Sequence, residues 1–329
     1  MKILVTGSTG FLGRYVVAEA LTHQHEVNAM VRATSDLTGI EWLDHPNLNV
    51  VQCDLCSESG VVDIVRDVDV VIHTAAAMSG DYRTQFAGTV SATENLLNAM
   101  VEVGASHIVS ISSFAVYDYL GLRCHSVLTE ESPLEKHPEV RHTYCQTKLH
   151  QENLVRKFAV EHEWRCSVIR PGAVYGHDHL WTTRLGLARG SWWLRFGSRA
   201  AVPLTYVENC AEAIVLAAEM MQAGVHVFNI VDDDPPTQRC YMKELQCRTQ
   251  PRPKVLPVSW TLLRVVSRVV WFVSKFLLGG RIKVPTMLVP ASLHASAKPL
   301  RYPNTHLKEK LNWTCRYSRS EALDRSVKT

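Results

Sequence analysis

The chain has 329 residues, of which 46% are hydrophobic and 20% are charged, with a formal net charge of +3 at pH 7. This is the composition of an ordinary folded protein with one large or two smaller domains. The small net charge gives no indication of a nucleic-acid partner. Nine cysteines are scattered without a framework, and only Cys53 and Cys56 have a redox-like or metal-like spacing, so we expect free thiols and no metal site. The first predicted strand begins at residue 2, which leaves no room for a signal peptide and favours a cytoplasmic protein.

The first elements predict a nucleotide site. An apolar strand, Ile3–Val5, is followed by the loop Thr6–Gly13 (TGSTGFLG) and a helix over Gly10–Thr22. Gly7 would allow a tight turn, Gly10 would let phosphate groups approach the backbone, and Gly13 would let the helix pack closely on the strand. A helix N-terminus offers free N–H groups and the positive end of a dipole to a pyrophosphate. The alternative is an ordinary strand–turn–helix unit.

Strands and helices alternate along the next 200 residues or so, which is typical of crossover connections and a parallel sheet covered on both faces. We therefore predict an α/β fold, a Rossmann-type doubly wound parallel sheet with a smaller C-terminal substrate lobe. The sheet domain would comprise residues 1–170 and 204–233, and the lobe residues 171–203 and 234–329. The further predicted strands are Glu26–Val31, Leu48–Gln52, Val68–His73, His107–Ile111, Arg165–Ile169 and His226–Ile230, and the further helices are Ser57–Arg66, Thr84–Val103, Arg141–His162 and Val207–Met221.

The lobe contains a basic, apolar segment, Ser259–Leu278, whose length would almost span a bilayer. Arg264, Arg268 and Lys275 fall at helical spacing on one stripe and argue against spanning. We predict an amphipathic helix with these cations on one side and its apolar side on protein or on lipid. Two interpretations stay open: a helix packed on its own protein or on the partner in a homodimer, and peripheral contact with a membrane.

Two groups of residues have the character of catalytic side chains. Tyr144 and Lys148 are four residues apart in a predicted helix, so they share one face. A tyrosine has an unperturbed pKa of about 10, and a nearby ammonium with a positive nicotinamide would lower it enough to accept a proton from an alcohol. Ser112 and Ser113 follow a predicted strand, where ligands bind in open parallel sheets. Either hydroxyl could bond a substrate oxygen, or both could simply cap or turn the chain.

Taken in their order along the chain, the motifs resemble those of the extended short-chain dehydrogenases/reductases, in the NAD-dependent epimerase/dehydratase group. The resemblance covers nearly the whole chain, and the ordered set is specific although each motif alone is not. The matching segments are Thr6–Gly13, Asp54–Leu55, Val71–Ala76, Ser112–Tyr117, Tyr144–Lys148, Arg170–Gly176, Leu204–Ala213, Phe228–Ile230, Leu307–Trp313 and Ser318–Ala322.

The resemblance implies the roles of particular residues. Tyr144 would be the acid/base, Lys148 would bind the nicotinamide ribose, and Ser113 would be the catalytic serine, with Ser112 as the next choice. Thr89 stands where the family usually has an asparagine, so a water-mediated proton relay is not carried over to that position. The implied cofactor contacts are Gly7, Thr9, Gly10, Phe11, Leu12 and Gly13 near the pyrophosphate, Asp54 and Leu55 near the adenine, Ala75 and Ala76 near the ribose, and Tyr144, Lys148, Pro171 and Gly172.

The end of the second strand bears on the choice of cofactor. Members that prefer NAD often place an acid there to accept from the ribose hydroxyls. This chain has Arg32 instead, and its first acid is Asp36. Because Arg32 could meet a 2′-phosphate and stack on adenine, we favour NADP(H) over NAD(H); the alternative is that Arg32 is only a loop cation.

The whole pattern predicts an enzyme that transfers a hydride between NAD(P) and a secondary alcohol or ketone of a small-molecule substrate. Within the family, the residues most resemble 3-beta-hydroxysteroid dehydrogenase-like and dihydroflavonol reductase-like members, which favours a hydrophobic or amphiphilic substrate. One alternative is a nucleotide-sugar epimerase or dehydratase with retained NAD, which would bind a diphosphate on Arg195, Arg199 or Arg281. The other is a non-catalytic dinucleotide-binding regulator.

Overall fold

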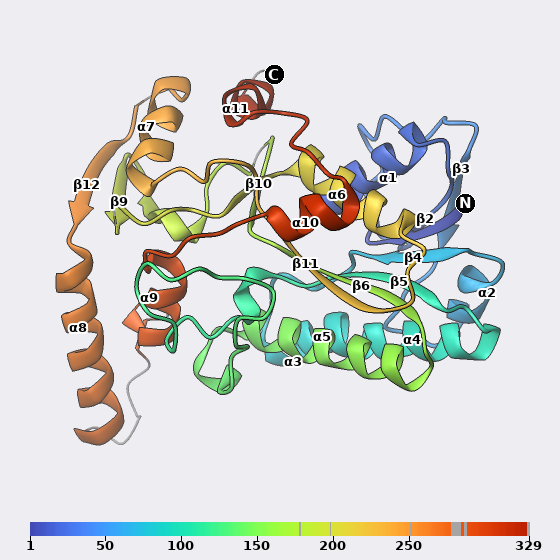
Figure 1. Ribbon diagram of the computed structural model, residues 1–329, viewed down its shortest axis with the longest axis horizontal. Coiled ribbons are helices and arrows are strands. Elements are labelled where there is room, and N and C mark those ends of the chain that lie inside the picture. The colour runs from blue at the N-terminus through green and yellow to red at the C-terminus, as the bar shows by residue number, and fades with distance from the viewer. Residues whose placement is uncertain (178, 198, 251, 278–283, 286–287, 328–329) are drawn as a thin grey trace.

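A computed structural model describes residues 1–177, 179–197, 199–250, 252–277, 284–285 and 288–327. Its centre is a seven-stranded sheet made of β1 (Lys2–Thr6), β2 (Glu26–Val31), β3 (Leu48–Gln52), β4 (Val70–His73), β5 (His107–Ile111), β6 (Arg165–Pro171) and β11 (Gly224–Ile230). The strand order is β11-β6-β5-β4-β1-β2-β3, and neighbouring strands pair in parallel (Figure 1). This confirms the predicted Rossmann-type doubly wound sheet.

The sheet is buried between two helical layers, because its strands are apolar on both faces. The helices of this domain are α1 (Phe11–Thr22), α2 (Val61–Val65), α3 (Tyr82–Phe86), α4 (Ala92–Val103), α5 (Thr143–Glu161) and α6 (Val207–Glu219). One core cluster joins α1 and α6 to the sheet, and a second joins α2, α4 and α5 to it. The two clusters hold β1 from both sides, which fixes the loop that follows it.

Two predicted helices differ from the structure. The helix predicted over Ser57–Arg66 is only α2, because Gly60 precedes it with a φ of 79° and sets a turn there. The helix predicted over Thr84–Val103 is divided into α3, a π-helical turn at Ala87–Ser91 and α4. Within the wide turn, the Thr89 hydroxyl accepts a hydrogen bond from the Ala77 amide at 3.0 Å, which ties this turn to the segment after β4.

The second part of the molecule is built from small sheets and helices. Its strands are β7 (Ala173–Tyr175), β8 (Gly186–Arg189), β9 (Trp192–Phe196), β10 (Leu204–Tyr206) and β12 (Lys254–Val258), and its helices are α7 (Gln238–Arg248), α8 (Trp260–Phe272), α9 (Pro290–Ala297), α10 (Thr305–Leu311) and α11 (Arg319–Val327). The helix α10 returns to the sheet domain, where Leu307, Leu311 and Trp313 join the core cluster of α1 and α6. The chain after residue 234 therefore contributes to both parts.

The segment predicted as an amphipathic helix is α8, capped by the Ser259 side chain and continued by a π-helical turn at Val273–Leu277; Leu278 lies outside the described residues. It stands at the end of the molecule far from β3 (Figure 1). Ser267 and Ser274 are buried, whereas Val269 and Phe272 are exposed. If the helix packed by its apolar side on its own chain, those residues would be covered, so the structure does not support that interpretation.

Among the residues that the structure describes, no helix combines the length and the apolar character needed to cross a bilayer.

A buried ion pair joins α5 to the sheet. The carboxylate of Glu152 on α5 accepts from both Nε and Nη2 of Arg170 on β6, the first at 3.0 Å. Arg170 also donates to the Tyr117 hydroxyl at 2.9 Å, and that hydroxyl donates to Asn229 on β11 at 2.6 Å. Both charged side chains are almost completely buried. The pair thus fixes the position of α5 over the ends of β6 and β11.

The protonation of Glu152 follows from its partner. Burial alone would raise the pKa of this carboxyl, but the hydrogen bond and charge of Arg170 hold it below the usual range, with help from Ser112. A carboxyl with a lowered pKa stabilises the fold above its unfolded pKa and loses that contribution as the pH falls through its folded pKa.

We predict that Glu152→Gln lowers the free energy of unfolding by about 3–5 kcal/mol at neutral pH, because it leaves Arg170 buried without a counter-charge. The difference from wild type should shrink as the pH falls below about 4. Denaturant unfolding monitored over pH checks this. Glu161→Gln, on the exposed end of the same helix, is the control and should change stability by less than about 0.5 kcal/mol. Equal stability of Glu152→Gln and wild type would contradict the role of the pair.

Candidate active site

A cavity of about 750 Å³ lies where the strand ends of the sheet domain meet the lobe. Ser113, Tyr144 and Gly172, three of the predicted site residues, line it together. Most of the remaining wall is apolar, and its nonpolar members are Met78, Phe114, Ala115, Ala173, Leu187, Phe196, Pro285, Leu293 and Ala295. A cavity of this size and lining suits a small molecule that is largely apolar.

Tyr144 is placed by the start of α5. The His142 side chain caps this helix by accepting from the Cys145 amide at 3.3 Å, so Tyr144 lies in the first turn, facing the cavity. Burial raises the pKa of Tyr144, and a hydrogen bond with Ser113 partly opposes this rise. From the sequence, Lys148 and a positive nicotinamide were expected to lower the pKa of Tyr144; within the chain itself, burial has the largest effect on this pKa.

The two neighbouring serines have different surroundings. The Ser112 hydroxyl is buried and donates to Glu152 at 2.6 Å, so it belongs to the ion pair that fixes α5. Ser113 lines the cavity and bonds Tyr144. Its oxygen also accepts from the Ala115 amide at 3.1 Å, which starts the 3-10 turn Phe114–Val116. Of the two candidates, Ser113 is the one that can reach a ligand.

Lys148 is buried, and its ammonium is held by hydrogen bonds to neighbouring groups of the chain. Its ammonium donates to the Ile111 carbonyl at 2.9 Å and to Gln151 at 2.8 Å. Burial lowers the pKa of Lys148 to about 7. The Gln151 amide in turn donates to Thr93 at 2.9 Å and lies 3.1 Å from the His73 ring.

His73 completes this buried network as a neutral side chain. Burial, with a smaller effect from Lys148, lowers its pKa to about 3. Its ring nitrogens lie 2.7 Å from the Thr6 hydroxyl and 2.8 Å from the Thr93 hydroxyl. Sequence reasoning missed Gln151, His73 and Thr93. One signal was present, since Gln151 follows Lys148 by three residues and Tyr144 by seven and therefore shares their helix face.

The glycine loop has the geometry of an anion site. Gly7 has a φ of 70°, and a Cβ on Gly13 would lie 2.1 Å from the Gly7 carbonyl oxygen. Gly10 is the N-cap of α1, and no side chain caps its first amides. The loop is tied to β2 because Ser8 donates to the Met30 carbonyl at 2.6 Å. These features fit the pyrophosphate of a dinucleotide.

The other residues of this loop have structural contacts. The Thr9 carbonyl accepts from Arg14 at 2.9 Å, and Leu12 packs against the core. Phe11 stacks on His179, with 3.9 Å between ring centroids. His179 is a further residue beside the loop that sequence reasoning missed.

The residues predicted to contact the adenine lie on two neighbouring loops. Arg32 is exposed directly after β2, and its charge opposes the rise that burial and Asp54 cause in the pKa of the Cys56 thiol. Asp54 accepts from the Cys56 amide at 3.0 Å, and the Leu55 carbonyl accepts from Asn95 at 2.9 Å. Arg32 therefore lies near the loop that carries Asp54 and Leu55.

The remaining predicted contacts lie at the ends of β4 and β6. A Cβ on Gly7 would lie 2.8 Å from the Ala75 Cα, so the loops after β1 and β4 touch, and Ala76 follows. Pro171 ends β6, and a Cβ on Gly172 would lie 2.2 Å from the Pro203 carbonyl oxygen. The close approach explains why glycine is needed where the chain passes from sheet to lobe.

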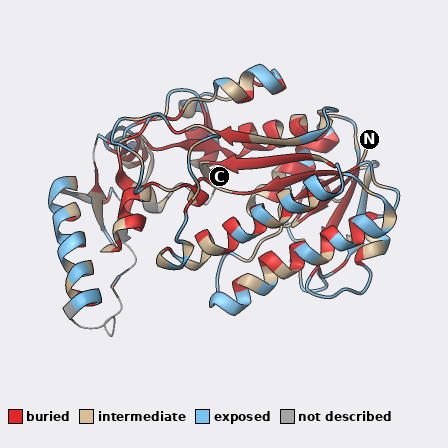
Figure 2. Cartoon of the chain, turned by 60° about the horizontal axis from the view of Figure 1, so that its bottom comes forward, coloured by how far each residue is buried: buried red, intermediate tan, exposed pale blue. Residues whose placement is uncertain are grey.

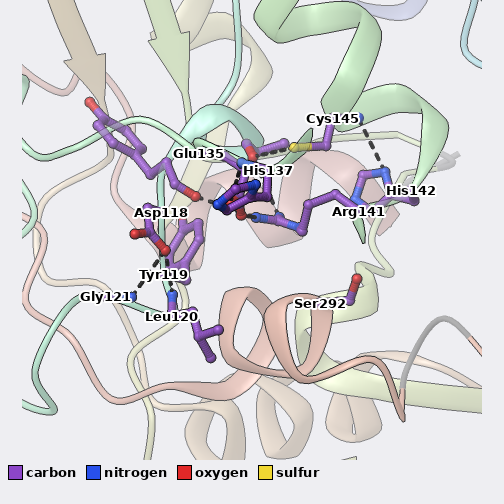
Figure 3. Close-up of polar contacts among 12 residues, drawn as sticks. Asp118, Tyr119, Leu120, Gly121, Glu135, His137, Arg141, His142, Cys145 and Ser292 are labelled. Carbon is purple, nitrogen blue, oxygen red and sulfur yellow. Dashed lines mark hydrogen bonds and ion pairs between the residues drawn. The ribbon is translucent and has the colours of Figure 1, made fainter. Parts of the chain in front are cut away.

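The cations of the cavity wall are not those expected for a bound diphosphate. Arg195 and Arg199 lie outside the cavity lining, and Arg281 lies outside the described residues. Arg141 and Arg184 line the wall instead. Arg141 pairs with Glu135 at 3.1 Å, across from Ser292 of α9 (Figure 3). Arg184 donates to the Ala295 carbonyl at 2.6 Å and to the Tyr119 hydroxyl at 2.8 Å.

A separate polar cluster lies at the start of β2. His23 Nδ1 and His25 Nε2 lie 2.8 Å and 2.9 Å from the same carboxylate oxygen of Glu219, and the ligand atoms of the three lie within 4.8 Å of one another. The sequence analysis expected no metal site and did not indicate this cluster, because Glu219 is 196 residues from His23. The contacts tie the end of α6 to the turn between α1 and β2.

Comparisons with known proteins agree with this geometry. The model of the NAD dependent epimerase/dehydratase family matches residues 3–231. A 3 beta-hydroxysteroid dehydrogenase/Delta 5-->4-isomerase of Mycobacterium tuberculosis is 29% identical over 231 residues, which cover 66% of this chain and 60% of the relative. A human sterol-4-alpha-carboxylate 3-dehydrogenase, decarboxylating, is 26% identical over 249 residues, which cover 71% of this chain and 63% of the relative. The chain thus spans about three fifths of the length of these relatives.

A solved dTDP-glucose 4,6-dehydratase from Bacillus anthracis, in complex with NAD, superposes with a TM-score of 0.71 at 18% identity, covering 99% of this chain and 95% of that one. This likeness shows the shared fold. The chain therefore belongs to the NAD dependent epimerase/dehydratase family.

Proposed function

We propose that this enzyme transfers a hydride between NADP(H) and a secondary alcohol or ketone of a hydrophobic or amphiphilic substrate. The observation that carries the proposal is the cavity in which Ser113 and Tyr144 meet beneath a largely apolar lobe. The cations on its wall support the same interpretation, because Arg141 is paired with Glu135 and Arg184 is bonded to the chain. A nucleotide-sugar diphosphate would need free cations there.

The residues have complementary roles in the chemistry. Ser113 would donate a hydrogen bond to the substrate oxygen, and Tyr144 would exchange a proton with that same oxygen. Bound at the glycine loop, NADP(H) would supply or accept the hydride at the carbon. Because burial raises the pKa of Tyr144, the chain by itself keeps the phenol protonated. This is the form that would protonate the carbonyl oxygen when a ketone is reduced.

The buried network behind Tyr144 would support this step. Gln151 and the Ile111 carbonyl hold the Lys148 ammonium below the active site, where it would reach a ribose of the cofactor. Since Lys148 has a lowered pKa and a neutral His73 lies behind it, the site holds little fixed charge away from the reacting atoms.

The direct test measures cofactor turnover with two sets of compounds. Hydroxysteroids and their ketones form one set, and UDP- and dTDP-linked sugars form the other. The proposal expects stoichiometric change in NADPH absorbance with members of the first set and release of the oxidised or reduced cofactor. Conversion of a nucleotide sugar without net change in NAD(P)H would instead indicate an epimerase or dehydratase. Binding of cofactor with no turnover of either set would favour a non-catalytic regulator.

Tyr144→Phe should reduce turnover by about 10²–10⁴-fold, since general acid–base groups contribute this much. The phenol hydroxyl is lost but the ring remains, so the dissociation constant for NADPH should stay within a few-fold of wild type. Steady-state kinetics and cofactor titration measure the two quantities. Near-normal turnover would remove Tyr144 from the proposed mechanism.

The two serines should differ in their effect on turnover. Ser113→Ala should lower turnover by about 10²-fold or more, as loss of a donor to a developing oxyanion does, and should cost about 1 kcal/mol of stability through the lost bond to the Ala115 amide. Ser112→Ala should leave turnover within a few-fold and cost about 1 kcal/mol of stability, because it removes one bond to Glu152. The reverse pattern, measured in the same assays, would show that Ser112 acts on the substrate.

Arg32→Glu should shift the cofactor preference from NADP(H) toward NAD(H). The change removes a cation that can pair with a 2′-phosphate and supplies an acceptor for a ribose hydroxyl. Titration of both cofactors against wild type and variant measures the ratio of affinities. A wild type that already prefers NAD(H), together with an unchanged variant, would show that Arg32 selects neither cofactor.

A further inference from the structure

We propose that α8 is a membrane-docking helix that lies in the plane of an anionic lipid surface. This inference is independent of the proposed reaction, because it rests on a surface outside the cavity. Figure 2 shows α8 as the most exposed helix at its end of the molecule.

The covered side of α8 is narrow and partly polar. Leu263 and Ser267 are buried, as is Ser274 in the following turn. The Ser267 hydroxyl donates to the Leu288 carbonyl at 2.8 Å, and Leu263 packs in a small cluster with Phe196 and with Leu293 of α9. These contacts hold the helix on the lobe without using most of its apolar residues.

The uncovered side is an apolar stripe. Its members are each more than half exposed and follow one another at intervals of three and four residues: Leu262, Val265, Val269, Phe272 and Phe276. Such spacing places them on one face of a helix. Side chains this large and apolar are costly to leave in water as a contiguous group, so a stripe of this kind indicates a docking surface. Leu256 of β12, which leads into α8, is also about half exposed.

The charges beside the stripe select an anionic partner. Arg268 and Lys275 are exposed, Arg264 is half-buried, and the three follow one flank of the stripe at helical spacing. No aspartate or glutamate occurs between Glu244 and Glu309. Long cationic side chains on the flank of an apolar face can reach lipid headgroups while the apolar face enters the acyl boundary. A second copy of the helix would bring like charges together with no acid in this segment to pair them.

Docking through α8 would bring the cavity close to the lipid. The helix α9, which supplies Ser292 and Leu293 to the cavity wall, packs directly against α8. An amphiphilic molecule could then pass between the lipid and the cavity without crossing bulk water. The proposal does not require this, since vesicle binding is measured without turnover.

The experiment is sedimentation of the purified full chain with vesicles of phosphatidylcholine alone or mixed with phosphatidylglycerol. Wild type should bind the anionic vesicles, and binding should weaken as salt rises. The double variant Val269→Asp with Phe272→Asp should lose binding by about tenfold or more. Val160→Asp, at an exposed valine on α5, is the matched control and should bind like wild type.

A second variant tests the charges. Replacing Arg264, Arg268 and Lys275 by Gln should weaken partition onto anionic vesicles by on the order of a hundredfold and leave weak binding to phosphatidylcholine unchanged. Thermal unfolding and NADPH affinity should match wild type in each variant. No binding by wild type, or equal binding by the aspartate variant, would overturn the proposal. So would a wild-type dimer in ultracentrifugation that the aspartate variant converts to monomer, because α8 would then face a second copy.

Discussion

The position of α5, the helix that carries Tyr144, depends on one buried ion pair, Glu152 with Arg170. The helix α5 carries Tyr144, Lys148 and Gln151 on successive turns, and its apolar residues Val155 and Ala159 join a core cluster with α2 and α4. The bidentate contact between the Glu152 carboxylate and the Arg170 guanidinium adds a directional constraint on this helix, because the contact has one good geometry and a high cost when broken. Through Ser112 the same carboxylate also fixes the end of β5, and so the neighbouring Ser113. The Ser113 hydroxyl, at the end of β5, and the Tyr144 hydroxyl, on α5, meet in the cavity because the Glu152–Arg170 pair holds both elements.

Burial sets the electrostatics of the site more than any single neighbour does. The chain places the Lys148 ammonium and the His73 imidazole in one buried network and the Tyr144 phenol beside the cavity. Low-dielectric surroundings disfavour the charged form of each group, which is why the pKa of Tyr144 is raised while those of Lys148 and His73 are lowered. Loss of water also strengthens each remaining hydrogen bond.

The sheet and its order of elements could be predicted from sequence, because buried parallel strands are apolar throughout and helices alternate with them. The position of the glycine loop could also be predicted, because the positive φ of Gly7 and the close backbone contact at Gly13 both favour glycine. Other features depend on contacts between distant segments. The division of the helix around Thr89 follows from a bond to Ala77, and the choice between Ser112 and Ser113 follows from Glu152, forty residues away. Arg141 and Arg184 were not anticipated as cavity residues, because tertiary packing that no local pattern records brings them to the wall.

The return of α10 to the sheet domain has a consequence for how the protein folds during synthesis. Leu307, Leu311 and Trp313 fill a space in the core against α1 and α6, and the Trp313 indole donates to the Asn209 carbonyl at 3.1 Å. The ribosome must therefore translate the chain as far as Trp313 before this part of the core can be completed. Because α10 packs in the core of the sheet domain, the lobe cannot be exchanged between relatives as one contiguous segment. New substrate preferences would therefore arise by substitutions within the lobe rather than by exchange of whole domains.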